Sequence, residues 1–193
     1  MSQTSALLVI DMQNSTVAIA HRAAETVSVI AGLRERALAA GVPVVTVQDQ
    51  GGEGMEPGSD GWQVVAELAP AGDGLVVRKT SPDSFLGTGL DAILKALGAT
   101  EVVVTGFATE MCVDTTARQA LSHGYDVVLV ANGHTTSVRP ESESESESES
   151  EFGAYAPADR SIAHHNEIFR NIRFPGRRVR VLPAAEVEFS PAL

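Results

Sequence analysis

Residues 101–131 read EVVVTGFATEMCVDTTARQALSHGYDVVLVA, with a short valine-rich run on each side of a longer polar segment. The two runs, Glu101–Thr105 and Asp126–Ala131, alternate so little between apolar and polar residues that they predict strands buried on both faces. The segment between them predicts a helix over Val113–His123, which ends at Gly124, a residue suited to a left-handed helix cap. A strand, a helix and a second strand in this order are typical of a parallel sheet.

The same alternation extends over the rest of the chain. Further strands are expected at Ala6–Ile10, Val44–Gln48, Leu75–Arg78 and Arg178–Leu182, and further helices near Ala23–Ala40, Asp60–Glu67, Thr88–Leu97 and Pro157–Arg170. Six parallel strands with right-handed crossovers predict an α/β fold, a three-layer αβα sandwich around a doubly wound, Rossmann-like sheet of order 3-2-1-4-5-6. No internal repeat or second core is visible, so residues 1–193 are expected to form a single domain.

The net charge is concentrated in one tract. The chain carries a formal charge of −11, but six glutamates lie in ESESESESESE at residues 141–151, so the remainder carries about −5, which is ordinary for a soluble domain. The tract has low complexity and is expected to form an acidic loop, interpreted as a tolerated insertion, with phosphorylation of its serines as the alternative. This charge balance argues against nucleic acid and anionic membranes as partners.

Several patterns bear on the cellular compartment. Cys112 is the single cysteine, which excludes an internal disulfide and is compatible with a reducing environment. No apolar run approaches the ~18 residues of a membrane span, and the amino-terminal run Ala6–Ile10 is too short for a secretory signal. The sequence therefore predicts a cytoplasmic protein.

Three chemically capable side chains follow predicted strands. Asp11 comes directly after the first strand, Lys79 after the third, and Cys112 after the fourth and the turn GFATEM. Doubly wound sheets bind ligands beyond the carboxyl ends of their strands, at the topological switch point where the strand order reverses. The first and fourth strands are neighbours at this point, so we expect Asp11 and Cys112 to meet. Each residue alone also has a purely structural explanation.

Together, the three side chains form a coherent hydrolytic set. The start of a helix and a nearby lysine ammonium would both lower the pKa of the Cys112 thiol. A carboxylate beside the thiol can take its proton and later deliver it to a leaving amine. Backbone N–H groups of the ATEMC segment can point at the oxygen of a carbonyl under attack, as in an oxyanion hole.

Four segments carry a family resemblance: LLVIDMQN, VVRKTSPDSFLGTGLD, VVVTGFATEMCVDTTARQAL and IAHHNEIF. In this order and spacing the chain, from Ala6 to about Phe189, resembles the isochorismatase-like cysteine hydrolase superfamily, which includes nicotinamidases and N-carbamoylsarcosine amidohydrolase-like enzymes. The resemblance implies a catalytic triad of Asp11, Lys79 and Cys112. It also implies a cis peptide between Phe107 and Ala108, and an oxyanion hole formed by the N–H groups of Ala108 and Cys112.

The chain departs from the nicotinamidase pattern after the second strand. Nicotinamidases of this superfamily bind a metal there through an aspartate and histidines, but the segment VQDQGGEGMEPGSDGW contains no histidine, and Asp49 alone cannot hold a transition metal. We therefore predict no metal and no cofactor. Trp62 and Phe85 are either walls of a substrate pocket or core residues.

The histidines receive no clear role from the sequence. His164, His165 and Asn166 are neighbours on a predicted helix and face different directions, which disfavours a shared metal, although one of them could form a hydrogen bond within the core or near the site. His134 has no assigned role.

The function expected from these features is metal-independent cleavage of a C–N bond in a small amide or carbamoyl substrate through a thioester. The alternatives are an isochorismatase-type vinyl-ether hydrolase, and a non-enzymatic thiol or ligand-binding member of the fold. The expected partners are a small-molecule substrate and, by analogy with related folds, other copies of the chain in a dimer or tetramer.

Overall fold

The computed structural model describes residues 4–52, 54–70, 72, 74–138 and 156–191. Its six strands are β1 (Ser5–Ile10), β2 (Val44–Asp49), β3 (Leu75–Lys79), β4 (Glu101–Phe107), β5 (Asp126–Thr135) and β6 (Val179–Leu182). All pair in parallel, in the order β3-β2-β1-β4-β5-β6, which confirms the predicted sheet. The serine and glutamate tract 141–151 lies outside the described residues.

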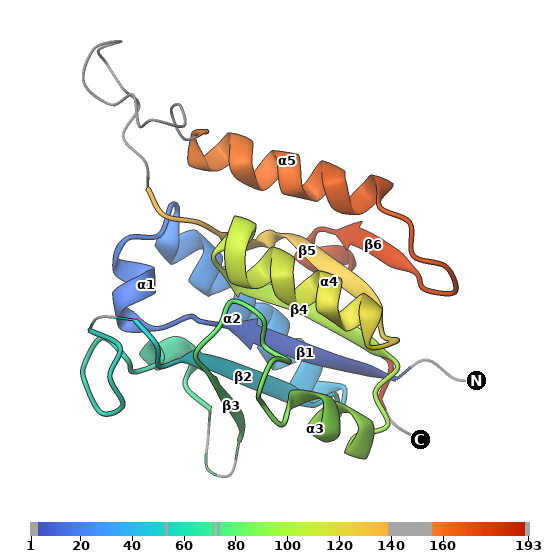
Figure 1. Ribbon diagram of the computed structural model, residues 1–193, viewed down its shortest axis with the longest axis horizontal. Helices are drawn as coiled ribbons and strands as arrows, with labels where there is room; N and C mark the ends of the chain where they lie inside the picture. Colours follow the sequence, from blue (N-terminus) through green and yellow to red (C-terminus); the bar gives the residue numbers. More distant parts are fainter. Residues whose placement is uncertain (1–3, 53, 71, 73, 139–155, 192–193) are drawn as a thin grey trace.

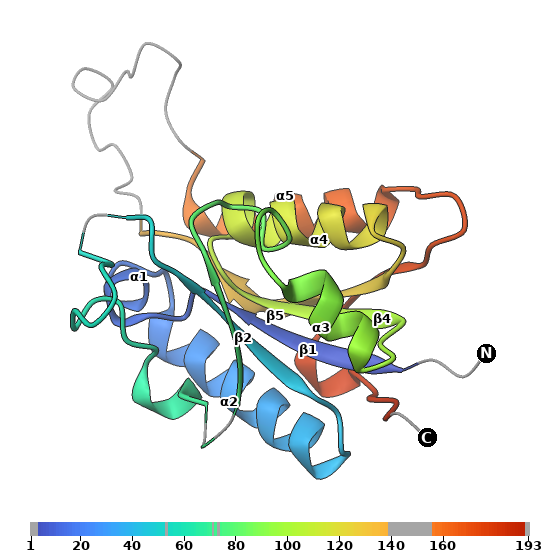
Figure 2. The same cartoon turned by 60° about the horizontal axis from the view of Figure 1, so that its bottom comes forward.

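Helices cover both faces of the sheet. They are α1 (Asn14–Ala18), α2 (Ala23–Ala39), α3 (Leu90–Ala96), α4 (Asp114–Ser122) and α5 (Ala158–Asn171). Figure 1 shows α4 and α5 on the same side of the sheet, and Figure 2 shows α2 on the opposite side. None of the described helices is long and apolar enough to cross a membrane.

The two faces divide the apolar side chains of the central strands. Along β1, Leu8 belongs to the core cluster that includes Phe169 of α5, whereas its neighbour Leu7 belongs to the cluster that includes Ile30 of α2. Successive side chains of a strand point to opposite faces, so a strand covered on both sides must be apolar at nearly every position. The unbroken valine and leucine runs of the sequence follow from this requirement.

The helix predicted over Asp60–Glu67 is wrong. Only a short 3-10 turn forms there, at Ala66–Leu68. The backbone before it bonds elsewhere: the carbonyl of Gln63 accepts from the N–H of Asn14 at 2.8 Å. Tertiary hydrogen bonds to the chain after β1 thus replace the bonds that a helix would make within itself.

The region after β4 also differs from expectation. A five-residue π-helical turn, Thr109–Val113, precedes α4, and the two replace the single helix predicted over Val113–His123. β5 continues to Thr135, beyond its predicted end. Its pairing with β4 shifts register between Val104 and Gly106, as at a β-bulge.

Candidate active site

Asp11 and the turn that carries Cys112 lie side by side because β1 and β4 are neighbours. The last paired residue of β1, Ile10, is opposite Gly106 of β4. Gly106 has φ +126°, and a Cβ atom there would lie 2.1 Å from the carbonyl oxygen of Ile10. Only glycine permits this approach, which brings the chain after β4 against the chain after β1.

Asp11 occupies a strained backbone conformation. Its φ of +51° lies in the left-handed region, which non-glycine residues seldom adopt. Hydrogen bonds hold it there: its N–H donates to the carbonyl of Val47 at 2.9 Å, and its carbonyl accepts from the hydroxyl of Thr16 at 2.5 Å. Strained backbone conformations of this kind cluster at functional sites, where the backbone must direct a side chain such as that of Asp11.

Lys79 lies at the centre of the site. It is the last residue of β3, two strands away from β1, and its long side chain crosses β2 to reach Asp11. The Nζ atom is 2.7 Å from Asp11 Oδ2, 3.5 Å from Asp49 Oδ2 and 3.3 Å from Cys112 Sγ. Lys79 is 2% exposed, so these contacts are made away from solvent.

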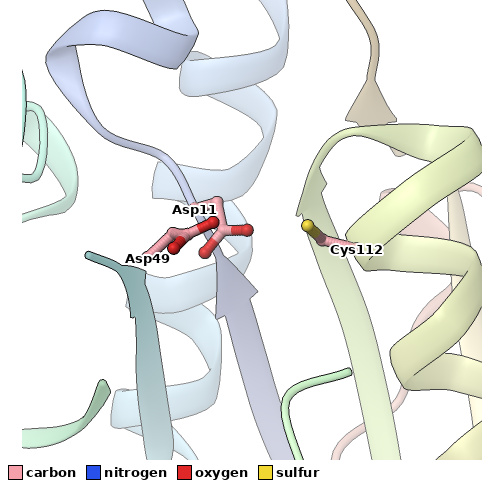
Figure 3. A group of neighbouring side chains, drawn as sticks. All are labelled: Asp11, Asp49 and Cys112. Carbon is pink, nitrogen blue, oxygen red and sulfur yellow. The ribbon is translucent and has the colours of Figure 1, made fainter. Parts of the chain in front are cut away.

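The side chains that surround Lys79 come from three different elements. Figure 3 shows Asp11 after β1, Asp49 at the end of β2 and Cys112 in the turn before α4, gathered at one edge of the sheet. Their nearest oxygen and sulfur atoms all lie within 4.8 Å of one another. The expected meeting of Asp11, Lys79 and Cys112 is therefore present, and Asp49 joins them.

Burial sets the ionisation of the carboxyl group. It raises the pKa of Asp11 to about 6, although the ammonium of Lys79 acts in the opposite direction. Asp11 Oδ1 is buried and has no hydrogen-bond partner among the described residues. A carboxylate with a raised pKa and a free lone pair is well suited to accept a proton near neutral pH.

The thiol behaves differently from the prediction. Burial, with the nearby charge of Asp11, raises the pKa of Cys112 to about 12, and Lys79 offsets only part of this effect. The expected lowering of the thiol pKa is therefore wrong, because desolvation outweighs the ammonium. For Lys79, burial would lower the pKa, but the two carboxylates and the sulfur raise it, so the amine is charged.

The backbone around Cys112 forms a tight turn. The peptide bond between Phe107 and Ala108 is cis. The carbonyl of Ala108 accepts from the N–H groups of Met111 and Val113 at 3.0 and 3.1 Å, which closes the turn beneath the half-buried Cys112. The backbone amide of Ala108 directly precedes the turn Thr109–Val113, and the amide of Cys112 lies near the end of that turn.

Gln13 joins the ends of β1 and β2. It is fully buried, its Nε2 donates to the carbonyl oxygens of Asp49 and Trp62, and its Oε1 accepts from the N–H of Asp49, all at 2.9 Å. These bonds fix the backbone of Asp49 beside Lys79. Gln13 is not among the residues predicted from the sequence, although a polar residue two positions after Asp11 at the end of a buried strand could have indicated it.

The cluster does not fit a metal ion. Asp11, Asp49 and Cys112 offer suitable ligand atoms, but the ammonium of Lys79 already contacts all three. A metal cation at this point would face the charge of Lys79 at close range and would have to displace it.

The two aromatic candidates differ in position. Phe85 is 7% exposed and stacks on His123 with ring centroids 4.5 Å apart, so of its two interpretations the structure favours the core. Trp62 is half-buried, follows the loop after β2, and lies under the guanidinium of Arg78 at 5.1 Å. Trp62 remains a predicted wall of the substrate pocket.

The histidines and Asn166 separate into different environments. His164 and His165 contact each other edge to face, and His165 Nδ1 bonds the carbonyl of Ser161 at 2.8 Å. Asn166 is buried and faces His134, which in turn contacts Thr109 of the turn before Cys112. Sequence spacing could not show this link, because the three residues are brought together only by the fold.

Comparison with known proteins gives consistent matches. Residues 5–150 match the family model described as the isochorismatase domain. Streptothricin hydrolase from Streptomyces noursei is 43% identical over 136 residues, which cover 68% of this chain and 49% of that protein. A ureidoacrylate amidohydrolase from Variovorax paradoxus is 34% identical over 79 residues, 41% of this chain and 31% of that protein. The chain thus spans about half the length, or less, of these curated relatives.

Solved structures show the same architecture. An isochorismatase from Pseudomonas putida KT2440 superposes with a TM-score of 0.80 at 25% identity, covering 95% of this chain and 90% of that chain. N-carbamoylsarcosine amidase from Thermoplasma acidophilum superposes with a TM-score of 0.72, also at 25% identity, covering 96% and 99%.

Proposed function

This chain belongs to the isochorismatase family, and we propose that it is a metal-independent cysteine hydrolase that cleaves a C–N bond of a small amide or carbamoyl substrate. The observation that carries the proposal is the buried cluster in which Lys79 Nζ contacts both Asp11 Oδ2 and Cys112 Sγ. The cation thus contacts both the nucleophile and the base, and ligand atoms of Asp11 and Cys112 lie within 4.8 Å of each other. The names of the relatives, a hydrolase, an amidohydrolase and an amidase, support the same class of reaction.

The first half of the reaction forms a thioester. Asp11 takes the thiol proton of Cys112 as the sulfur bonds to the substrate carbonyl carbon, and the π electrons move to the carbonyl oxygen. The N–H groups of Ala108 and Cys112 stabilise this oxyanion. The oxyanion then re-forms the carbonyl, the C–N bond breaks, and Asp11 gives its proton to the departing nitrogen.

The second half returns the enzyme to its starting state. Water attacks the thioester carbon while Asp11 accepts one of its protons, and the C–S bond breaks to release the acid. The proton on Asp11 then returns to the sulfur of Cys112. Through both halves, Lys79 keeps the cluster together, because its ammonium stabilises negative charge on either Asp11 or Cys112.

The raised pKa of the thiol is compatible with this scheme. Cys112 is protonated at neutral pH and needs a base within reach, and Asp11 offers the unpartnered Oδ1 atom. The thiolate therefore forms together with the attack instead of before it. A protonated resting thiol also resists adventitious oxidation, because the thiolate is the reactive form.

Trapping the acyl-enzyme tests the proposal. The protein is mixed with a library of small amides and carbamoyl compounds in buffer that contains a chelator, and the intact mass is measured after rapid quenching. We expect an acyl adduct on Cys112 and continuous release of acid. Cys112→Ala should lose both while its thermal unfolding stays close to that of the wild type.

Two results would count against this function. Full turnover by Cys112→Ala would remove the nucleophile from the scheme, and activity that survives this change but is lost in Asp11→Asn would indicate vinyl-ether hydrolysis instead. Loss of wild-type turnover on chelation would contradict metal independence.

A further inference from the structure

A histidine is buried directly behind the turn that carries Cys112. His134 lies near the end of β5, is 2% exposed, and pairs with Gly106 of β4. The register shifts between the pairs Val104–Leu129 and Gly106–His134 because β5 has extra residues there, and this irregularity places His134 beside Gly106 instead of beyond the end of β4. The proposed mechanism makes no use of this side chain.

Both ring nitrogens of His134 are engaged in a directional chain of hydrogen bonds. Asn166 of α5 donates from Nδ2 to the carbonyl of Ala131 at 3.0 Å, so its Oδ1 is the acceptor that faces His134 Nε2 at 3.1 Å. The proton of the imidazole is therefore on Nε2, and Nδ1 offers a lone pair. The hydroxyl of Thr109 donates to that lone pair at 2.8 Å.

Thr109 is the point at which this chain reaches the active site. It is the first residue of the π turn, follows Ala108 directly, and is 1% exposed. The middle of the turn is less enclosed, since Cys112 is half-buried and Met111 is 54% exposed, whereas Val113 at its far end is buried again. A buried anchor at Thr109 therefore constrains the start of a turn whose middle is open to solvent.

We propose that His134 is a positioning residue, which holds Thr109, and through it the turn with the amides of Ala108 and Cys112, against β5 and α5. The effect on turnover rests on the proposed function, but the effect on the position of the turn does not.

A role as proton donor or acceptor toward substrate does not fit His134. Its two nitrogens already face Thr109 and Asn166, and burial lowers its pKa to about 4, so the ring is neutral at working pH. A neutral imidazole with both nitrogens occupied serves as a rigid spacer between two elements.

A matched pair of variants separates the two hydrogen bonds. The amide oxygen of asparagine can take the place of Nδ1, so His134→Asn keeps an acceptor for Thr109. The amide nitrogen of glutamine can take the place of Nε2, so His134→Gln keeps the donor to Asn166 but leaves the Thr109 hydroxyl unpaired. Thr109→Val and Thr109→Ser form a second pair, which removes or keeps the hydroxyl without changing His134.

Turnover gives the first readout. We expect His134→Gln and Thr109→Val to lower kcat roughly tenfold to a hundredfold, as for a misplacement of about 1 Å, with KM and the acid limb of the pH profile unchanged. His134→Asn and Thr109→Ser should stay within about threefold of the wild type. A double variant, His134→Gln with Thr109→Val, should lose no more than either single variant, because both break the same bond.

Alkylation of Cys112 by iodoacetamide, without substrate, gives a readout independent of turnover. A turn released from Thr109 exposes the sulfur, so His134→Gln should react at least about threefold faster than the wild type, and His134→Asn at the wild-type rate. Thermal unfolding identifies variants that have lost the fold. If a His134 variant has lost it, the comparison of Thr109→Val with Thr109→Ser tests the proposal in its place.

The proposal is overturned if His134→Asn is impaired as much as His134→Gln, if both match the wild type, or if the loss lies in KM or in a shifted acid limb. Failure of the proposed function would look different: the wild type itself would form no acyl adduct, while the alkylation rates of the two His134 variants would still differ.

Discussion

Titration of Asp11 should change activity and stability in opposite directions between pH 4 and pH 7. Asp11 accepts the thiol proton only when it is ionised, and its pKa is raised to about 6 by burial. With that pKa, about one-tenth of the protein holds the ionised form at pH 5 and about one-hundredth at pH 4. The value of kcat/KM should therefore fall nearly tenfold per pH unit below pH 6, with a slope of one.

The same shift has the opposite consequence for folding. The pKa of Asp11 is 3.8 when unperturbed and about 6 in the folded chain, so the folded state binds the proton more tightly than the unfolded state. Stability from this group is present below pH 3.8 and is lost as the pH rises through 6. The full loss is about 3 kcal/mol, of which roughly 2 kcal/mol falls between pH 4 and pH 7.

Comparison with Asp11→Asn isolates this contribution. The free energy of unfolding is measured by urea denaturation of both proteins at pH 4, 5, 6 and 7, and the difference between them is plotted against pH. The wild type should lose roughly 2 kcal/mol relative to the variant over this range. A difference that is flat with pH, a difference of the opposite sign, or a kcat/KM plateau that extends down to pH 4.5 would contradict a raised pKa of Asp11.

Two further changes probe the surroundings of Asp11. Lys79→Met leaves Asp11 and Asp49 without their shared cation, so it should nearly abolish turnover and destabilise the fold by about 3–5 kcal/mol. It should also move the acid limb of any residual activity to higher pH. Urea denaturation measures the loss of stability, and pH-rate profiles measure the change in the acid limb. Gly106→Ala should prevent folding or lower the free energy of unfolding by several kcal/mol, since its Cβ would lie 2.1 Å from a backbone oxygen. Gly32→Ala has open space in α2 and should raise the free energy of unfolding by about 1 kcal/mol. Equal effects of the two substitutions on urea denaturation would contradict this expectation.

The sequence was sufficient for the architecture and for three residues of the candidate site. Apolar runs in β1 and β4 must be buried on both faces, and this requirement alone implies helices on each side of a parallel sheet. Polar residues that directly follow such strands must lie at one edge, so the order of residues along the chain was enough to place Asp11 beside Cys112, and the family resemblance added Lys79 to them. The helix predicted over Asp60–Glu67 failed because local polarity does not reveal hydrogen bonds to a distant segment.

Only the tertiary structure decided how the site is charged and held. The sequence contained Asp49, but its place beside Lys79 depends on the bonds from Gln13, and the link from His134 to Thr109 depends on the register of β5 against β4. The pKa of Cys112 also depends on the tertiary structure, because burial and the nearby charge of Asp11 raise it. Patterns along a chain report which residues follow which strand, whereas ionisation depends on burial and on distances of a few ångströms between elements far apart in sequence.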